Sequence, residues 1–259
     1  MSILTVTELG KSFGGIKAVD GVTFSVERGE LLALIGPNGA GKSTTFNMLN
    51  GQLRADRGTI LLDGQSLVGL APRAIWRLGV GRTFQIAQTF ASLTVVENVQ
   101  MTLISDQRKI FSLWRRASQQ HREAALALLA QVGMADAADR ACSELAYGDV
   151  KRVELAMALA HKPKLLLMDE PTAGMAPLER NELISLTRKL AREQQIAVLF
   201  TEHSMDVVFG YADRIVVLAR GQLIAHGTPA AVRENPQVQA VYFGSGKTFA
   251  SAAETRAVA

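Results

Sequence analysis

The sequence predicts an α/β fold, in which a mixed β-sheet core is interrupted by a mostly helical insert. Three observations support this prediction. Short apolar runs typical of buried strands occur at 31–35, 165–168 and 197–201. A glycine-rich turn follows the first run and leads into a predicted helix at 45–49. Between about 94 and 160 the residue pattern changes to alanine and leucine at helical spacing, which indicates a helical insert rather than further strands.

The strands expected around the glycine-rich turn are short. Residues 3–9 and 22–26 alternate or cluster β-forming side chains, so each predicts a strand. The run at 60–64 ends at the turn residue Gly64 and predicts a third. We expect all three strands to flank the turn.

The insert and the end of the chain can also be divided. Residues 123–132 and 154–160 carry apolar side chains at helical spacing and predict two helices. Residues 214–218 and 221–224 predict a terminal hairpin. The last residues, 245–259, are small and polar without a pattern, which predicts a disordered tail.

Composition excludes several classes of protein. The chain has 259 residues, of which 48% are hydrophobic and 20% charged, as in globular proteins. Its net charge of +4 permits an anionic partner only weakly, and we expect no nucleic acid. Cys142 cannot form an internal disulfide, which fits a reducing compartment and a small buried side chain. The sequence shows no signal peptide and no apolar run near the roughly 18 residues of a membrane span.

The glycine-rich turn fits G-x-x-x-x-G-K-[ST], the phosphate-binding loop. Its glycines let backbone N–H groups face phosphate oxygens, and the N-terminus of the following helix favours an anion. We expect Lys42 to reach the β- and γ-phosphates and the Ser43 hydroxyl to bind Mg²⁺. A chance match is the alternative, but the flanking strand and helix argue against it. The predicted phosphate-binding residues are Gly36, Asn38, Gly39, Ala40, Gly41, Lys42, Ser43 and Thr44.

An acidic pair, Asp169 and Glu170, closes the predicted strand at 165–168. A carboxylate there can hold Mg²⁺, because this ion prefers oxygen ligands and keeps much of its hydration. Glu170 could polarise the water that attacks the γ-phosphate. The structural alternative is a helix N-cap, and the phosphate-binding loop earlier in the chain favours the catalytic interpretation.

Three further side chains become candidate nucleotide or metal contacts once the phosphate-binding loop is considered. Gln85 could contact Mg²⁺ or the attacking water. His203 follows the strand at 197–201 and could reach a γ-phosphate, although a lone histidine is usually structural. Phe13 precedes two glycines and could stack on adenine, with packing in the core as the alternative.

The order and spacing of these motifs resemble the ATP-binding cassette family, over residues 1 to about 244. The resemblance implies a phosphate-loop NTPase core with a RecA-like mixed sheet, an antiparallel β-subdomain and a helical subdomain inserted at about 90–160. It implies ATP and Mg²⁺ as cofactors. Asp169 would organise the metal, directly or through Gln85 and water, and His203 would act as the switch histidine.

The resemblance also implies that two cassettes dimerise head to tail, so that each ATP is covered by the signature of the other chain. In this sequence the signature position is occupied by Leu145, Ala146, Tyr147, Gly148 and Asp149. The family usually has Leu-Ser-Gly-Gly-Gln, so Ala146 lacks a hydroxyl and Asp149 adds a charge. Ala176, in the interface loop at 173–176, also departs from the usual Asp or Asn. The alternative is that backbone N–H groups and the helix dipole suffice at the signature.

Several segments are similar to importer cassettes of the branched-chain amino acid class: 36–42, 82–85, 93–99, about 100–125, 201–203 and 238–244. This similarity implies an ATP hydrolase peripheral to the cytoplasmic face of the cell membrane. Its partners would be a second cassette, identical or different, two membrane permeases and, indirectly, an extracytoplasmic solute-binding protein. The permease groove is expected between the Gln85 region and the insert near 90–100. The cargo stays open among branched-chain amino acids and related small solutes.

Two other functions compete with this interpretation. A non-transport cassette acting on nucleic acid or ribosomes usually carries long coiled coils or tandem cassettes, and the sequence shows neither. A phosphate-loop kinase would need an acceptor site and a lid. It would not need the motifs at Gln85, 145–149 and His203.

Overall fold

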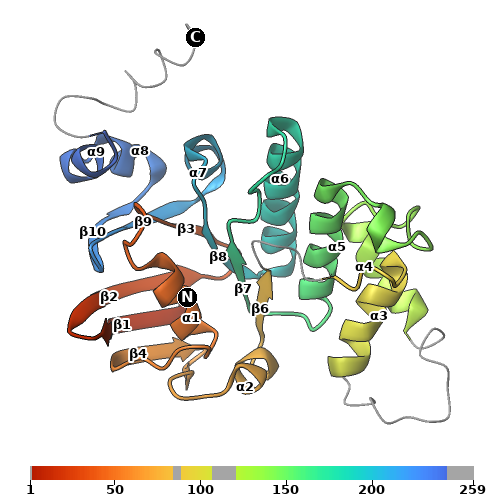
Figure 1. Ribbon diagram of the computed structural model, residues 1–259, viewed down its shortest axis with the longest axis horizontal. Coiled ribbons are helices and arrows are strands. Elements are labelled where there is room, and N and C mark those ends of the chain that lie inside the picture. The colour runs from red at the N-terminus through yellow and green to blue at the C-terminus, as the bar shows by residue number, and fades with distance from the viewer. Residues whose placement is uncertain (1, 84–88, 107–120, 244–259) are drawn as a thin grey trace, which may run out of the picture.

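Two β-sheets form the framework of the molecule. The computed structural model describes residues 2–83, 89–106 and 121–243 (Figure 1). The first sheet is antiparallel, with the strand order β2-β1-β4-β5. Its strands are β1 (Ser2–Phe13), β2 (Ile16–Glu27), β4 (Arg57–Leu62) and β5 (Gln65–Ser66).

The second sheet is mostly parallel and has the order β10-β9-β3-β8-β7-β6. Only β10 runs antiparallel, against β9. The strands are β3 (Leu31–Ile35), β6 (Val80–Thr83), β7 (Leu165–Asp169), β8 (Ala197–Thr201), β9 (Arg214–Ala219) and β10 (Gln222–Gly227). The carboxyl ends of β3, β7 and β8 therefore lie at one edge, where the chain leaves each strand for a loop.

The apolar run at 31–35 is explained by burial on both faces of this sheet. Leu31 and Ile35 pack into one hydrophobic core with the helices of the insert. Leu32 and Leu34 point to the other side and pack with the antiparallel sheet and with Phe46 of α1 (Lys42–Leu49). A strand buried on both faces shows no alternation of polar and apolar residues.

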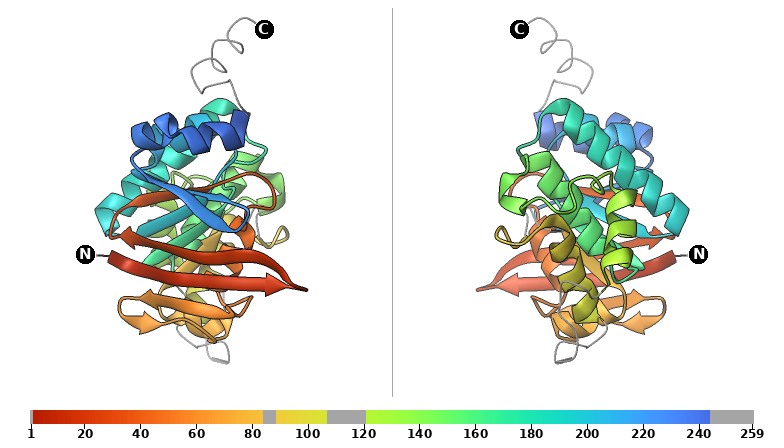
Figure 2. Two further views of the ribbon diagram at one scale, coloured as in Figure 1. Left: turned by 90° about the vertical axis from the view of Figure 1, so that its left-hand side faces the viewer. Right: turned by 90° about the vertical axis from the view of Figure 1, so that its right-hand side faces the viewer.

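The remaining helices lie in the insert and around the two sheets. The insert contains α3 (Val95–Asp106), α4 (Arg122–Gln131) and α5 (Tyr147–Leu159), which contact one another beyond β6 (Figure 1). Both side views in Figure 2 place α8 and α9 on the opposite side of the parallel sheet from the antiparallel strands. The other helices are α2 (Pro72–Arg77), α6 (Pro177–Gln194), α7 (Met205–Tyr211), α8 (Pro229–Glu234) and α9 (Pro236–Phe243). In the described part of the chain, no helix is both long and apolar enough to cross a membrane.

The structure confirms the predicted α/β class, the helices at 123–132 and 154–160, and the terminal hairpin that turns at Arg220 and Gly221. The strands expected at 3–9 and 22–26 are too short. β1 and β2 form one long ribbon whose ends pair Phe13 with Ile16. Its outer part is exposed, with Phe13 and Ile16 beside polar residues, so backbone pairing holds it without a buried apolar face.

Several elements lie outside the predicted set, and β6 and α6 show why. Strand β6 contains Gly81 and Arg82, which are poor strand signals, and its pairing with β7 holds it in place. Helix α6 is rich in charged residues, and only a narrow stripe is buried. The predicted tail at 245–259 falls outside the described residues. Cys142 is buried, as expected, and its sulfur accepts a hydrogen bond from Asn98.

Candidate active site

The phosphate-binding loop connects β3 to α1, as the sequence predicts. Gly41 directly precedes the helix with φ of 103°, and a Cβ there would lie 2.5 Å from the Ala18 carbonyl oxygen. A Cβ on Gly36 would lie 2.2 Å from the carbonyl oxygen of Leu218. Both positions therefore require glycine, because the backbone of a neighbouring segment approaches too closely for a side chain.

The N-terminus of α1 is prepared for an anionic ligand. No side chain caps the helix at Gly41, so its first backbone N–H groups face the loop. Ser43, Asn38 and Gly39 are exposed beside it. Ala40 differs from these residues, because it is buried and its N–H donates to the Pro37 carbonyl. Its contribution to a phosphate site is therefore the shape of the loop.

Lys42 lies inside the loop that it is predicted to serve. Its Nζ donates to the carbonyl oxygens of Gly36, at 2.7 Å, and Pro37, at 3.2 Å. Burial lowers the pKa of Lys42, and the charges of Glu170 and Asp169 oppose this shift. Phosphate oxygens are stronger acceptors for an ammonium than loop carbonyls, so they can replace them without moving the charge far.

Asp169 and Glu170 meet one threonine from the next strand. Register in the parallel sheet pairs Asp169 with Thr201, and the Thr201 hydroxyl donates to Asp169 Oδ1 at 2.8 Å. The N–H of Glu170 donates to the same hydroxyl oxygen at 3.0 Å. Sequence reasoning missed Thr201, although its place at the end of a predicted strand beside β7 was the available signal.

Glu170 and His203 are brought into contact. His203 Nε2 lies 3.0 Å from Glu170 Oε1, and the backbone of Glu170 adopts φ of 46°, which is unusual for a residue other than glycine. The next helix in the chain, α6, has Ala176 as its N-cap. The acidic pair therefore does not cap that helix, and its carboxylates instead face Thr201, Arg82 and His203.

Glu202 holds the loop that carries His203. It is 5% exposed and accepts hydrogen bonds from the Thr172 N–H at 3.0 Å and the Thr172 hydroxyl at 2.6 Å. Its other carboxylate oxygen accepts from the N–H of His203 at 3.1 Å. Because Thr172 follows Glu170 by two residues, this buried carboxylate fixes the loop after Glu170 to the loop that carries His203. No local pattern in the sequence indicates that Glu202 is buried.

The oxygen donors at this edge fit Mg²⁺. The exposed Ser43 hydroxyl and the part-buried Asp169 carboxylate are ligand types that this ion takes together with water and nucleotide phosphates. Gln85, the third expected contact, lies outside the described residues. Arg82, three residues earlier, places Nη2 3.4 Å from Asp169 Oδ2.

Phe13 does not pack in the core. Its side chain lies at the tip of the β1–β2 ribbon and is 50% exposed, with Lys11 Nζ 5.6 Å from the ring centroid. The alternative of a core residue is therefore wrong, and the ring has a face that a base could use.

The signature position lies at the N-terminus of α5. Ala146 is the N-cap residue and supplies no side-chain hydrogen bond, and Asp149 stands in the first turn. Tyr147 is 42% exposed, whereas Leu145 packs against the core. A Cβ on Gly148 would lie 3.3 Å from the carboxyl carbon of Glu179, so a second acid stands beside this helix end.

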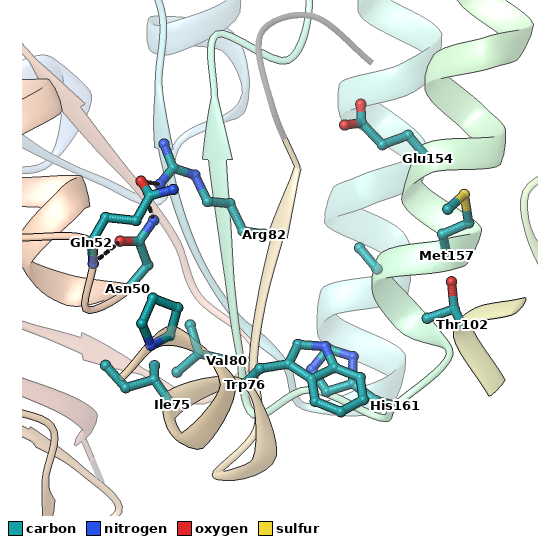
Figure 3. Close-up of a pocket in the computed structure, with 12 residues that line it drawn as sticks. Asn50, Gln52, Ile75, Trp76, Val80, Arg82, Thr102, Glu154, Met157 and His161 are labelled. Carbon is teal, nitrogen blue, oxygen red and sulfur yellow. Dashed lines mark hydrogen bonds between the residues drawn. The ribbon is translucent and has the colours of Figure 1, made fainter. Parts of the chain in front are cut away.

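A groove of about 310 Å³ separates the core from the insert (Figure 3). Asn50, Gln52 and Arg82 lie along one side, and Thr102, Glu154 and Met157 lie along the other. The rings of Trp76 and His161 stack between them, with centroids 4.7 Å apart. Its described lining thus joins the segment before Gln85 to the first helix of the insert.

The chain is similar to known proteins over most of its length. The sequence model of the ABC transporter family matches residues 19–173, and one for branched-chain amino acid ATP-binding cassette transporters matches residues 222–248. The chain is 40% identical to LivG, a high-affinity branched-chain amino acid transport ATP-binding protein of Escherichia coli K12, over 93% of this chain and 98% of LivG. It is 39% identical to BraF, which has the same description, of Pseudomonas aeruginosa, again over 93% and 98%.

The fold has a solved counterpart. The crystal structure of MJ1267, an ATP-binding cassette of an ABC transporter, in its ADP conformation superimposes with a TM-score of 0.84. That structure is 34% identical and covers 95% of this chain and 100% of its own. The RecA-like parallel sheet, the antiparallel β-subdomain and the helical insert are therefore those of an ABC ATPase. With the phosphate loop, acidic pair and histidine assembled at one edge of the sheet, this chain belongs to the ATP-binding cassette transporter family, as an ATPase subunit of the LivG/BraF class.

Proposed function

We propose that this chain energises the import of branched-chain amino acids or closely related small solutes, working at the cytoplasmic face of the cell membrane. The identity to LivG over nearly the whole of both chains carries this proposal, because LivG is described as a branched-chain amino acid transport ATP-binding protein. The C-terminal match at 222–248 supports the same class.

Each catalytic group has a role that its contacts support. Lys42 exchanges two loop carbonyls for β- and γ-phosphate oxygens, while the N-terminus of α1 holds the same anion. Mg²⁺, held by Ser43 and Asp169 and by Gln85, would neutralise charge on the phosphates. Glu170 accepts the proton of the attacking water, and His203 orients that carboxylate and contacts the γ-phosphate. Positioning and charge stabilisation do most of the work in phosphoryl transfer.

A second cassette completes each site in this proposal. The half-site on Lys42 is covered by the partner's signature, and residues 145–149 of this chain cover the partner's nucleotide. Phe13 adds an aromatic face for the adenine. The exposed surfaces of Tyr147 and Phe13 are available for these contacts.

The groove between the core and the insert receives a short cytoplasmic helix of a permease. The exposed opening lies between two units of the fold, so a helix seated there contacts both. Ile75, Trp76 and Met157 offer apolar contacts, and the polar side chains of Asn50, Gln52 and Thr102 lie on opposite sides. An amphipathic helix with polar ends matches this pattern.

Reconstitution tests the proposal. The chain, co-expressed with its permeases and partner cassette, is placed in proteoliposomes with the binding protein outside and ATP inside. Uptake of labelled leucine, isoleucine and valine is compared with uptake of amides, urea and aromatic acids, with Glu170→Gln as the inactive control. We expect ATP-dependent uptake of a branched-chain amino acid. Failure of the chain to copurify with any permease, or ATP use that does not respond to permease and binding protein, contradicts the proposal.

A further inference from the structure

Arg82 lies between the groove and the candidate metal site. It is the third residue of β6, and its side chain is only 14% exposed. One end of the guanidinium, Nη1, donates to Gln52 Oε1 at 2.8 Å and to Asn47 Oδ1 at 3.2 Å. The other end, Nη2, reaches Asp169 Oδ2 at 3.4 Å. A single side chain therefore contacts the groove wall and the carboxylate predicted to organise Mg²⁺.

The polar partners of Arg82 connect both regions. Asn47 belongs to α1, the helix that begins at Lys42. Gln52 lines the groove, and its backbone N–H donates to Asn50 Oδ1 at 3.0 Å on the same wall. Figure 3 shows Arg82 turned toward Gln52 and Asn50. A change at this wall thus reaches the catalytic edge through one guanidinium.

Arg82 and Mg²⁺ would compete for Asp169 if this carboxylate holds the metal. Oδ1 of Asp169 already accepts the Thr201 hydroxyl at 2.8 Å, so Oδ2 is the oxygen on which the arginine and a metal would meet. Two cations close to one carboxylate repel each other, and the repulsion is strong where the surroundings are part-buried. Arg82 keeps its charge under all physiological conditions, so it can leave Asp169 only if another acceptor receives it.

We propose that Arg82 is a positioning residue that couples the groove to the metal: it holds Asp169 until an acceptor oxygen on the bound permease helix draws it away, and Asp169 then takes Mg²⁺. The coupling to a permease rests on the proposed function, whereas the competition at Asp169 does not. A carboxylate or an end-of-helix carbonyl is the acceptor that suits a guanidinium fork.

The experiment measures Mg²⁺ binding without turnover. The chain, loaded with a non-hydrolysable ATP analogue in a Trp114→Phe background, is titrated with Mg²⁺ while the fluorescence of Trp76 in the groove is recorded, and isothermal calorimetry repeats the titration. Arg82→Gln is expected to need about three- to tenfold less Mg²⁺ for half-saturation, because the competing charge is gone. Arg73→Gln, on the exposed face of α2, removes the same charge away from Asp169 and should leave Mg²⁺ binding unchanged.

A second readout separates coupling from competition. Detergent-solubilised permease should lower the Mg²⁺ requirement of the wild-type chain and leave that of Arg82→Gln unchanged. Arg82→Lys keeps the charge and guards against a folding defect, and its Mg²⁺ requirement should stay near that of the wild type. An unchanged Mg²⁺ requirement in folded Arg82→Gln overturns the inference whether or not the permease binds. An equal permease effect in both chains overturns the coupling, and a wild-type chain that cannot bind permease contradicts the proposed function instead.

Discussion

Two regions of the molecule are built differently. One is the edge of the parallel sheet that carries Lys42, Asp169, Glu170 and His203, called here the catalytic edge. The other is the N-terminus of α5 with residues 145–149, called here the signature end. At the catalytic edge, charged side chains are held by further side chains: Thr201 fixes Asp169, and Glu202 fixes the loop of His203. At the signature end, Ala146 supplies no hydrogen bond and Asp149 stands in the first helical turn with the carboxylate of Glu179 nearby. One region is prepared by many contacts, and the other depends on backbone N–H groups and the helix dipole.

This difference bears on how two cassettes would share work. In a head-to-tail dimer the catalytic edge of this chain faces the partner's signature, while the signature end of this chain faces the partner's nucleotide. With a partner of different sequence the two ATP sites would be unequal. We infer that hydrolysis runs mainly at the site that contains Lys42 and Glu170 of this chain.

The largest expected effect is that of Glu170→Gln. Loss of the proposed general base should lower ATP turnover by about 10²- to 10⁴-fold while nucleotide binding persists, because Asp169, the proposed metal ligand, is unchanged. Turnover by phosphate release and binding by a fluorescent ATP analogue are measured on the complex with its partner cassette. The matching change in the partner should cost much less. Equal losses from the two variants would remove the difference between the sites.

Lys42→Ala tests the catalytic edge through its affinity for ATP. One charge-assisted contact of about 1.5–3 kcal/mol corresponds to a loss of roughly 10- to 150-fold in affinity for ATP. Calorimetric titration measures the affinity, and circular dichroism checks the fold. Lys17→Ala, which removes an exposed lysine paired with Asp20, is the matched control and should bind ATP normally. Normal affinity in Lys42→Ala would show that the loop backbone alone holds the nucleotide.

The double variant Ala146→Ser with Asp149→Gln tests the signature end. It restores a hydroxyl and removes a negative charge, so turnover at the partner's site should rise by up to about tenfold. Turnover is assayed with Glu170→Gln in this chain, so that only the partner's site contributes. No gain in turnover would mean that the backbone at 145–149 already suffices.

Glu179→Gln should have the smallest effect. Its carboxylate lies beside Gly148, and its removal should raise turnover at the partner's site by no more than about twofold, because water screens the charge. The gain should shrink as salt is increased in the same assay. Glu193→Gln, an exposed acid further along α6, should leave turnover unchanged. A salt-independent gain would point to a packing effect instead.

Most of the site could be predicted from local patterns. The phosphate loop was identifiable because its glycines, Lys42 and Ser43 stand at fixed spacing between a strand and a helix, and the structure places them there. The residues that position the site, Thr201 and Glu202, could not be predicted from such local patterns. In the sequence, Thr201 looks like any residue of a strand and Glu202 like any acid beside one. Their roles emerge only when β7 pairs with β8, which brings Thr201 against Asp169 and Glu202 against Thr172.

Short-range spacing and periodicity are enough to predict the α/β class, the helical insert and the candidate phosphate, metal and acid–base groups. Three features follow only from the folded chain: the strand order that gathers Asp169, Glu170 and His203, the length of the exposed β1–β2 ribbon, and the position of Arg82 between the groove and Asp169. The reason is that these features arise from contacts between segments far apart in the chain. Such contacts leave little trace in the local pattern of any one segment.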